Sequence, residues 1–236
     1  MGIVIGPGIT IGPGITFDTP TAPPPPTVFG QAYGGGYYAG QIKQNNITYY
    51  LIVAPKATGQ AASRQYKTTA TAAPSATITL NNGPAASASM NSASYPAAEF
   101  CEGLSIGGFT DWYMPARDEL ELCYRNLKPR ANNNVPDVRE KSSLTYPEGN
   151  DVTGNGIGVN LNSVPQGAAY TTTNPAQTSA VLFQEGNSEA FEISNYWSSS
   201  EFSTTEAWRQ SFVNGYQFNV AKDSAWFVRA VRRVPV

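Results

Sequence analysis

The chain has 236 residues, enough for one large domain or two small ones. It carries 15 Lys and Arg against 17 Asp and Glu, a net charge of -2, which gives no basic surface for nucleic acid and no polybasic membrane anchor. Histidine is absent and there are 2 cysteines, which excludes His-based triads, nearly all familiar zinc sites and a disulfide framework. No apolar run approaches the length of a transmembrane helix, and the N-terminus does not resemble a signal peptide.

The first 27 residues predict an extended arm. Ile5 to Thr10 reads Ile-Gly-Pro-Gly-Ile-Thr, and the same six residues follow from Ile11 to Thr16. Gly and Pro interrupt the β-forming residues so often that neither a helix nor a long strand is expected. Extended structure against a neighbouring copy and a disordered tail both fit this composition. Pro20 and Pro23 to Pro26 then predict a stiff polyproline spacer, and residues 28–236 form the domain that follows.

The first part of the domain predicts one buried strand and a long surface loop. Tyr49 to Val53 is a short apolar run suited to a buried strand. Residues 57–94 are mostly Ala, Ser, Thr, Asn and Gly. We expect them to form surface loop, with Thr77 to Leu80 as their only strand-like piece.

Two helices are predicted from the spacing of apolar residues. The first runs from Pro96 to about Leu104, with Cys101 on its apolar stripe. The second follows Pro115 and ends before Pro129, with Cys123 on its stripe. We expect both cysteines to be buried free thiols that act as small hydrophobic residues.

The rest of the chain predicts loops followed by strands. Residues 129–180 contain no convincing regular element, because Asn, Pro, Gly and Thr dominate. Aromatic residues alternate with polar ones in the last fifty positions, and Phe227 to Arg232 is expected to be a single closing strand. Two helices, short antiparallel strands and long loops together predict an α+β domain.

One block of the sequence resembles a known signature. Residues 107–120 read Gly-Gly-Phe-Thr-Asp-Trp-Tyr-Met-Pro-Ala-Arg-Asp-Glu-Leu. This block resembles the motif of the DUF1566 family, which is similar to the C-terminal domain of the Legionella collagen-like adhesin. Tyr196 to Glu201 and Val228 to Arg232 follow in the family's order, so the resemblance covers roughly residues 28–236.

The resemblance implies a C-type lectin-like fold, shared with phage tropism determinants and with formylglycine-generating enzymes. The Ile-Gly-Pro-Gly arm also looks like the N-termini of some bacteriophage virion proteins. Together these features predict a virion protein that is made in the host cytoplasm without a signal peptide. The arm would contact other virion proteins, and a homo-oligomer is expected because repeated weak sites gain from multivalency.

The motif block itself is interpreted as structural. Trp112 is expected to fill the core, with Asp111 or Arg117 satisfying buried backbone groups beside it. Arg229, Arg232 and Arg233 are expected to form ion pairs at strand edges rather than to clamp a ligand.

Neither catalysis nor a cofactor is predicted. Formylglycine-generating enzymes need cysteines in the C-terminal part of the domain, whereas both cysteines here lie on the predicted helices. No other nucleophile and base stand at a recognisable spacing. Glu148 to Asn155 offers oxygen ligands without the spaced Asp pattern of a calcium loop, so a solvated turn is expected and no metal is assigned.

The remaining hypothesis is a binding surface near the C-terminus. In phage proteins that this chain resembles, the ligand face lies between the Trp-Ser-Ser block and the last strand. Carried onto this sequence, the ligand-binding positions are Glu201, Phe202, Thr204, Arg209, Gln210, Asn214, Tyr216, Gln217, Asn219, Asp223 and Ser224. Tyrosine supplies rigid contact area, and amides and hydroxyls supply adaptable hydrogen bonds.

Three functions follow from these expectations. The first is a non-catalytic virion protein, such as a tail fibre, whose head binds a host surface glycan or protein. The second is a structural protein that decorates the capsid or tail and contacts only other virion subunits. The third, a bacterial surface adhesin, is disfavoured because the sequence shows no signal peptide.

Overall fold

The computed structural model describes residues 24–136, 146–147 and 159–236, and it is mostly β. About 18% of the structure is helical and 30% is strand, arranged as two curled, largely antiparallel sheets. The prediction of an α+β, C-type lectin-like domain with two helices is therefore wrong. Strands outweigh helices because segments without any clear periodic pattern also pair into the sheets.

The first sheet contains the N-terminal strands and the last strand of the chain. Its order is β1-β2-β3-β10. The short strand β5 also pairs with β2, at Gln41 and Ile42, beyond the residues that pair with β1. Asn45 and Asn46 both have positive φ, as a two-residue hairpin between β2 and β3 requires. The strand predicted at Tyr49 to Val53 is confirmed as part of β3. The bounds are β1 Ala32–Tyr33, β2 Gly36–Gln44, β3 Ile47–Val53, β5 Ser163–Val164 and β10 Val231–Pro235.

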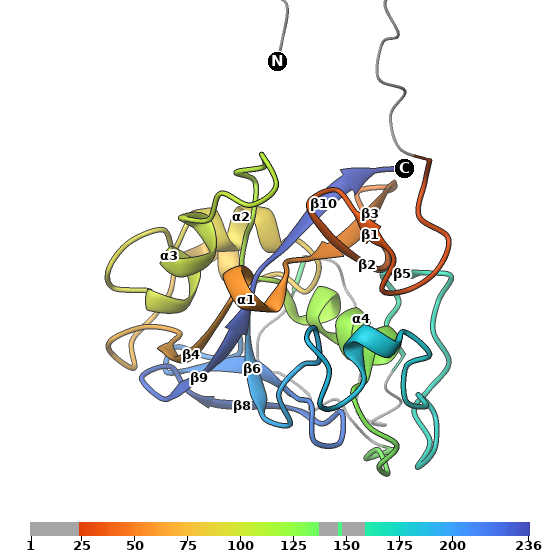
Figure 1. Ribbon diagram of the computed structural model, residues 1–236. Helices are drawn as coiled ribbons and strands as arrows, with labels where there is room; N and C mark the ends of the chain where they lie inside the picture. Colours follow the sequence, from red (N-terminus) through yellow and green to blue (C-terminus); the bar gives the residue numbers. More distant parts are fainter. Residues whose placement is uncertain (1–23, 137–145, 148–158) are drawn as a thin grey trace, which may run out of the picture.

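The second sheet is built mainly from the C-terminal part of the chain. Its order is β4-β9-β6-β7-β8, and every pairing is antiparallel except that of β6 with β9. Figure 1 shows this sheet below the first one, with β10 and β3 above. The bounds are β4 Gln60–Gln65, β6 Asn195–Glu201, β7 Glu206–Ser211, β8 Gln217–Ala221 and β9 Ala225–Arg229.

The last two strands join the two sheets. Ala230 lies between β9 and β10, so the single strand predicted at Phe227 to Arg232 is in fact two strands in different sheets. The backbone of Ala230 donates to Gly59 O at 2.9 Å and accepts from Ala54 N at 2.9 Å. These bonds hold the chain at the point where it passes from one sheet to the other. A local alternation of apolar residues cannot reveal such a change of partner.

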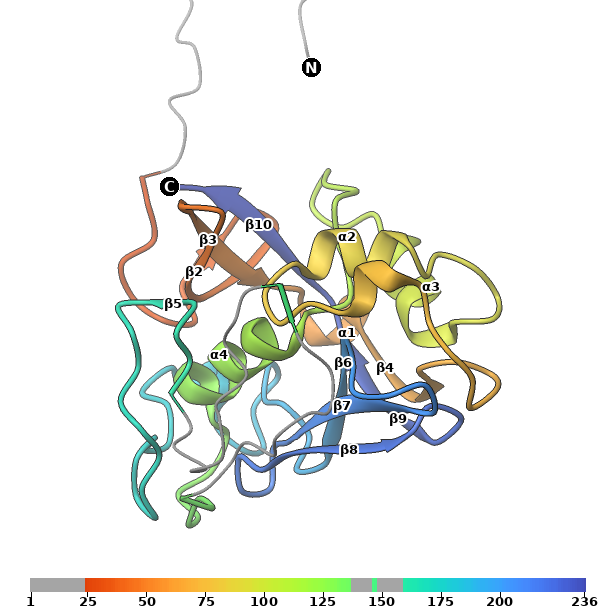
Figure 2. The ribbon, with the colours of Figure 1, turned by 180° about the vertical axis from the view of Figure 1, so that it is seen from behind.

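The two predicted helices are present. They are α3 at Pro96–Glu102 and α4 at Arg117–Leu127. Helix α4 packs against β2 of the first sheet and against β6 and β7 of the second. Both views show it between the two sheets, with α2 and α3 together to one side (Figures 1 and 2). Helix α4 therefore fills the space between the sheets.

The prediction for residues 57–94 is wrong. This stretch completes α1 at Lys56–Gly59 and supplies β4, a 3₁₀ turn at Ser75–Thr77 and α2 at Gly83–Ala88. The buried residues of α2 are small, namely Gly83, Ala86 and Ser87, so the helix has no apolar stripe. The strand-like piece at Thr77 to Leu80 is not a strand, although Leu80 is buried.

Buried residues form two clusters. The first surrounds α4 and includes Leu120, Tyr196 and Phe212. The second lies by α3 and includes Trp112 and Trp197. Among the described residues, every helix is too short or too polar to span a lipid bilayer. A further short helix, a 3₁₀ turn at Val181–Phe183, precedes β6.

Candidate functional site

A group of aromatic side chains surrounds Arg209 on one face of the second sheet. Arg209 of β7 lies opposite Phe218 of β8 in the strand register, so both side chains project from the same face. Trp226 comes from β9, and Tyr216 stacks on Phe218 with 5.4 Å between the ring centroids. These four residues are called the Arg209 patch below. Their aromatic members are half-buried.

The guanidinium of Arg209 lies between two aromatic rings. Its Cζ is 3.8 Å from the centroid of Phe218 and 4.0 Å from that of Trp226. Each ring face attracts a cation, an interaction worth about 0.5–2 kcal/mol depending on solvation. The two rings therefore hold the planar group in one orientation.

Arg209 lacks the hydrogen bonds that a buried arginine normally makes. The residue is only 9% exposed, yet within the described part of the chain its Nε and Nη1 have no hydrogen-bond partner. The neighbouring Trp226 Nε1 is also buried and unpaired there. Burial lowers the pKa of Arg209 to about 10, so the side chain is still charged at neutral pH. Each unpaired buried donor costs about 1–3 kcal/mol. The patch thus presents donors whose partner could be a ligand.

Comparison with known proteins places the chain in a family. A family model described as the Lcl C-terminal domain, from the Legionella collagen-like protein, matches residues 65–232. The chain belongs to this family. A comparison with curated proteins finds none that matches. The Lcl C-terminal domain is an adhesin-like surface domain, and the match includes every residue of the Arg209 patch.

Of the predictions for the motif block, the one that Trp112 fills the core is confirmed. Trp112 is buried and its Nε1 donates to Phe109 O at 3.1 Å. Asp111, however, forms an ion pair with Arg232 instead of binding buried backbone. The guanidinium of Arg117 lies over the ring of Trp208, with its Cζ 3.5 Å from the ring centroid.

The prediction that the C-terminal arginines form ion pairs is confirmed. Arg229, Arg232 and Arg233 bind Glu189, Asp111 and Glu119, respectively, with a nitrogen-to-oxygen distance of 2.7 Å in each pair. Arg209 differs from all three, because within the described residues it has no carboxylate partner.

Three of the predicted ligand-binding residues lie inside the domain. Glu201 forms an ion pair with the buried Lys222 and accepts from Ala73 N at 3.0 Å. Gln210 Nε2 donates to Gly215 O at 2.6 Å, and Gln217 Oε1 accepts from Arg117 Nε at 3.0 Å. The structure places these three side chains below the surface, where they hold turns and α4 in position. A polar residue type alone does not reveal such internal use.

The other predicted positions divide between the two ends of the sheet. Phe202 and Thr204 lie in the β6–β7 loop, beside the β8–β9 turn that holds Asp223 and Ser224. Lys222 joins this loop to this turn, because its Nζ donates to Thr204 O at 2.8 Å. The remaining half-exposed positions, Asn214 and Tyr216, are at the opposite end, in the β7–β8 turn, and Asn219 projects from the face opposite Phe218. Only Arg209 and Tyr216 come together in the patch.

The other two members of the patch, Phe218 and Trp226, could not be predicted from the sequence. Phe218 and Trp226 belong to the aromatic residues that alternate with polar ones in the last fifty positions, and neither is predicted to bind a ligand. Alternation shows which residues of one strand share a face, but it does not show which residues of other strands lie beside them or whether helices cover that face. The cluster by α3 buries Trp197, Ala207 and Val228 and also packs against Trp226, whereas Tyr216, Phe218 and Trp226 stay half-buried.

Cys101 and Cys123 are buried free thiols, as predicted. Burial raises the pKa of each thiol above its usual range, which disfavours the reactive thiolate. Within residues 24–136, 146–147 and 159–236, no three Asp, Glu or Cys side chains are placed to hold a metal ion. The stretch from Glu148 to Asn155 lies outside the described residues.

Proposed function

We propose that this chain is a non-catalytic virion protein of a bacteriophage whose head binds a host surface glycan or protein through the Arg209 patch. The observation that carries the proposal is the charged guanidinium held between Phe218 and Trp226 with unpaired donors. Membership in an adhesin-like surface family supports a binding role. The resemblance of the N-terminal repeat to virion arms supports the phage context.

The chemistry of the patch fits recognition of a surface molecule. Aromatic faces supply rigid contact area with little conformational entropy to lose. A planar guanidinium donates two parallel hydrogen bonds to a carboxylate or to neighbouring oxygens. A glycan or an exposed protein loop offers both apolar faces and acceptor oxygens. Tyr216 extends this surface beyond Phe218, since the two rings stack.

The test is binding of the fluorescently labelled full chain to a panel of bacterial cells. Saturable binding to a narrow set of strains is expected, and it should survive a chelator because no metal is part of the proposal. Arg209→Met should weaken binding at least about tenfold, the effect typical of a central anchor residue. Tyr216→Ala should weaken it less, because Phe218 remains.

A matched control separates the patch from general charge effects. Arg130 forms an ion pair with Glu185, a partner outside the patch, so Arg130→Met makes the same chemical change elsewhere. It should leave binding unchanged. If Arg130→Met and Arg209→Met weaken cell binding equally, the Arg209 patch is not the binding site. A folded protein that binds no cell, including the host of its virus, would favour the structural role on the virion.

A further inference from the structure

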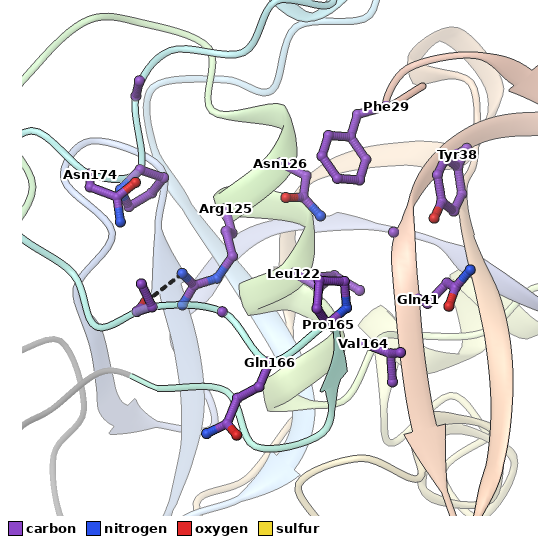
Figure 3. Close-up of a pocket in the computed structure, with 15 residues that line it drawn as sticks. Phe29, Tyr38, Gln41, Leu122, Arg125, Asn126, Val164, Pro165, Gln166 and Asn174 are labelled. Atoms are coloured by element: carbon purple, nitrogen blue, oxygen red, sulfur yellow. Dashed lines mark hydrogen bonds between the residues drawn. The ribbon is translucent and has the colours of Figure 1, made fainter. Parts of the chain in front are cut away.

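A groove of about 420 Å³ lies between α4, β2 and residues 164–176. Figure 3 shows Phe29 and Tyr38 on one side of it and Pro165 across from them. Pro175 lines it further along, and Leu122 of α4 contributes an aliphatic surface. The groove is thus bordered by aromatic rings and rigid proline rings.

Amide side chains stand among these apolar groups. Gln41, Gln166 and Asn174 all line the groove, as the close-up shows (Figure 3). Gln166 and Asn174 are exposed. Their side-chain amides form no hydrogen bond with any other described residue. Their donors and acceptors are free for an incoming chain. A groove of this composition suits an extended peptide.

Proline-rich peptides have the complementary chemistry. A proline has no backbone N–H, so its segment forms few internal hydrogen bonds and leaves its carbonyl oxygens available. Grooves that recognise such peptides combine aromatic walls with side-chain donors for those carbonyls. This chain contains a segment of that kind, because Ile5 to Thr16 repeats Ile-Gly-Pro-Gly-Ile-Thr.

We propose that the groove binds the Ile-Gly-Pro-Gly segment of a second copy of this chain. The described chain starts at Pro24, and Phe29 already forms part of the groove wall. Pro23 to Pro26 are a proline run in the sequence, and such runs are stiff and extended, at about 3.1 Å per residue, so within this proposal the arm does not fold back onto its own Phe29. The segment therefore reaches a neighbour's groove more readily than its own.

Exposed apolar residues near the spacer support contact with a second copy. Val28 is 59% exposed and Val181 is 63% exposed. The segments that contain Val28 and Val181 lie next to each other, because Gly30 packs directly against Ala180. The inference deepens the homo-oligomer expected from the sequence and is independent of the Arg209 patch of the proposed function.

The first experiment measures association of the full chain by analytical ultracentrifugation. Ala176 is an exposed groove residue, and Ala176→Arg adds bulk and charge there without altering the core. It should weaken self-association at least about tenfold. Ile9→Asp combined with Ile15→Asp should do the same from the arm side. Combining the groove and arm changes should add little further loss, since both remove one contact.

The matched control is Ala88→Arg, the same change at an exposed position of α2 outside the groove. It should leave association unchanged. A wild-type chain that is monomeric, or an oligomer that neither the groove variant nor the arm variant weakens, would overturn the inference.

The second experiment tests whether the contact joins two copies. A photo-crosslinking amino acid at position 176 is introduced into heavy-nitrogen-labelled chain, which is mixed with unlabelled chain. Cross-links from position 176 to unlabelled residues 1–19 are expected by mass spectrometry. Cross-links confined to labelled peptides would show binding within one chain and overturn the inference. Loss of cell binding with an intact oligomer would instead contradict only the proposed function.

Discussion

Arg229 and Arg209 lie in the same sheet but are held in opposite ways. Arg229 is buried and uses all its nitrogens, donating to Ala54 O at 2.9 Å and to Glu189 O and Oε2 at 2.7 Å each. Arg209 is nine-tenths buried, and among the described residues its guanidinium lies between the rings of Phe218 and Trp226, with Nε and Nη1 unpaired. The first arrangement completes the fold, and the second leaves donors unpaired among the described residues, as the proposed binding role requires.

The difference separates stability from binding. A buried ion pair whose hydrogen bonds are complete costs a great deal to break, because the remaining charge has no partner. A charged group without hydrogen bonds contributes little to the fold, and its removal relieves desolvation. Substitutions at the two arginines should therefore affect different measurements.

The largest effect is expected for Arg229→Met. The change removes the charged partner of the Glu189 carboxylate in the interior, which keeps the backbone N–H of Lys56 at 2.8 Å and the Tyr37 hydroxyl as neutral partners. The free energy of unfolding should fall by about 3–5 kcal/mol in urea denaturation. Adding Glu189→Gln should restore part of the loss, because it removes the unpaired charge. A loss below about 1 kcal/mol would show that the pair does not hold the two sheets together.

An effect of intermediate size on the free energy of unfolding is expected at alkaline pH, from Tyr196 in the core beside Arg229. Burial raises the pKa of Tyr196, whose ring packs on Phe191 beside Arg229. An unfolded tyrosine titrates near about pH 10, so the stability linked to Tyr196 is complete below that pH and is lost as the pH rises above it. The loss for this group approaches about 1.4 kcal/mol per pH unit. Urea denaturation at a series of alkaline pH values should show that the free energy of unfolding of Tyr196→Phe falls less steeply with pH than that of the wild type. Identical slopes for the two proteins would contradict the assignment to Tyr196.

The smallest change in stability is expected for Arg209→Met. No hydrogen bond is lost within the described structure, and the methionine still packs between Phe218 and Trp226. The free energy of unfolding should change by less than about 1 kcal/mol in either direction. A loss as large as that of Arg229→Met would mean that the patch supports the fold, and the contrast between the two arginines would fail.

The sequence predicts elements with a regular pattern. Helix α4 is found because Leu120, Cys123 and Leu127 recur at helical spacing and are buried. Helix α2 is missed because its buried side chains are Ala86 and Ser87, which carry no apolar signal. The fold class is wrong because segments without an alternating apolar pattern also form strands, as β4 does in the stretch predicted to be loop.

The candidate site shows the same limit. Arg209 and Tyr216 are predicted from their position in the family's ligand face, and both belong to the patch. Gln210 and Gln217 are predicted on the same grounds, yet both are buried. Their amides form hydrogen bonds inside the domain, Gln210 with the backbone of Gly215 and Gln217 with the side chain of Arg117. Local sequence gives the polar character of a side chain. Whether that side chain meets solvent depends on which distant elements pack over it.

The segment around Ala230 has a consequence for how the domain is assembled. Strand β10 pairs with β3 in the first sheet, and β9 lies between β4 and β6 in the second, so both sheets need strands that are synthesised after the strands they pair with. Pairing partners this distant in sequence make folding slow, since a long loop must close before any contact forms. Residues 225–235 must therefore leave the ribosome before either sheet is complete. Until then β3 and β4 emerge with unpaired edges, and the nascent chain is exposed to aggregation.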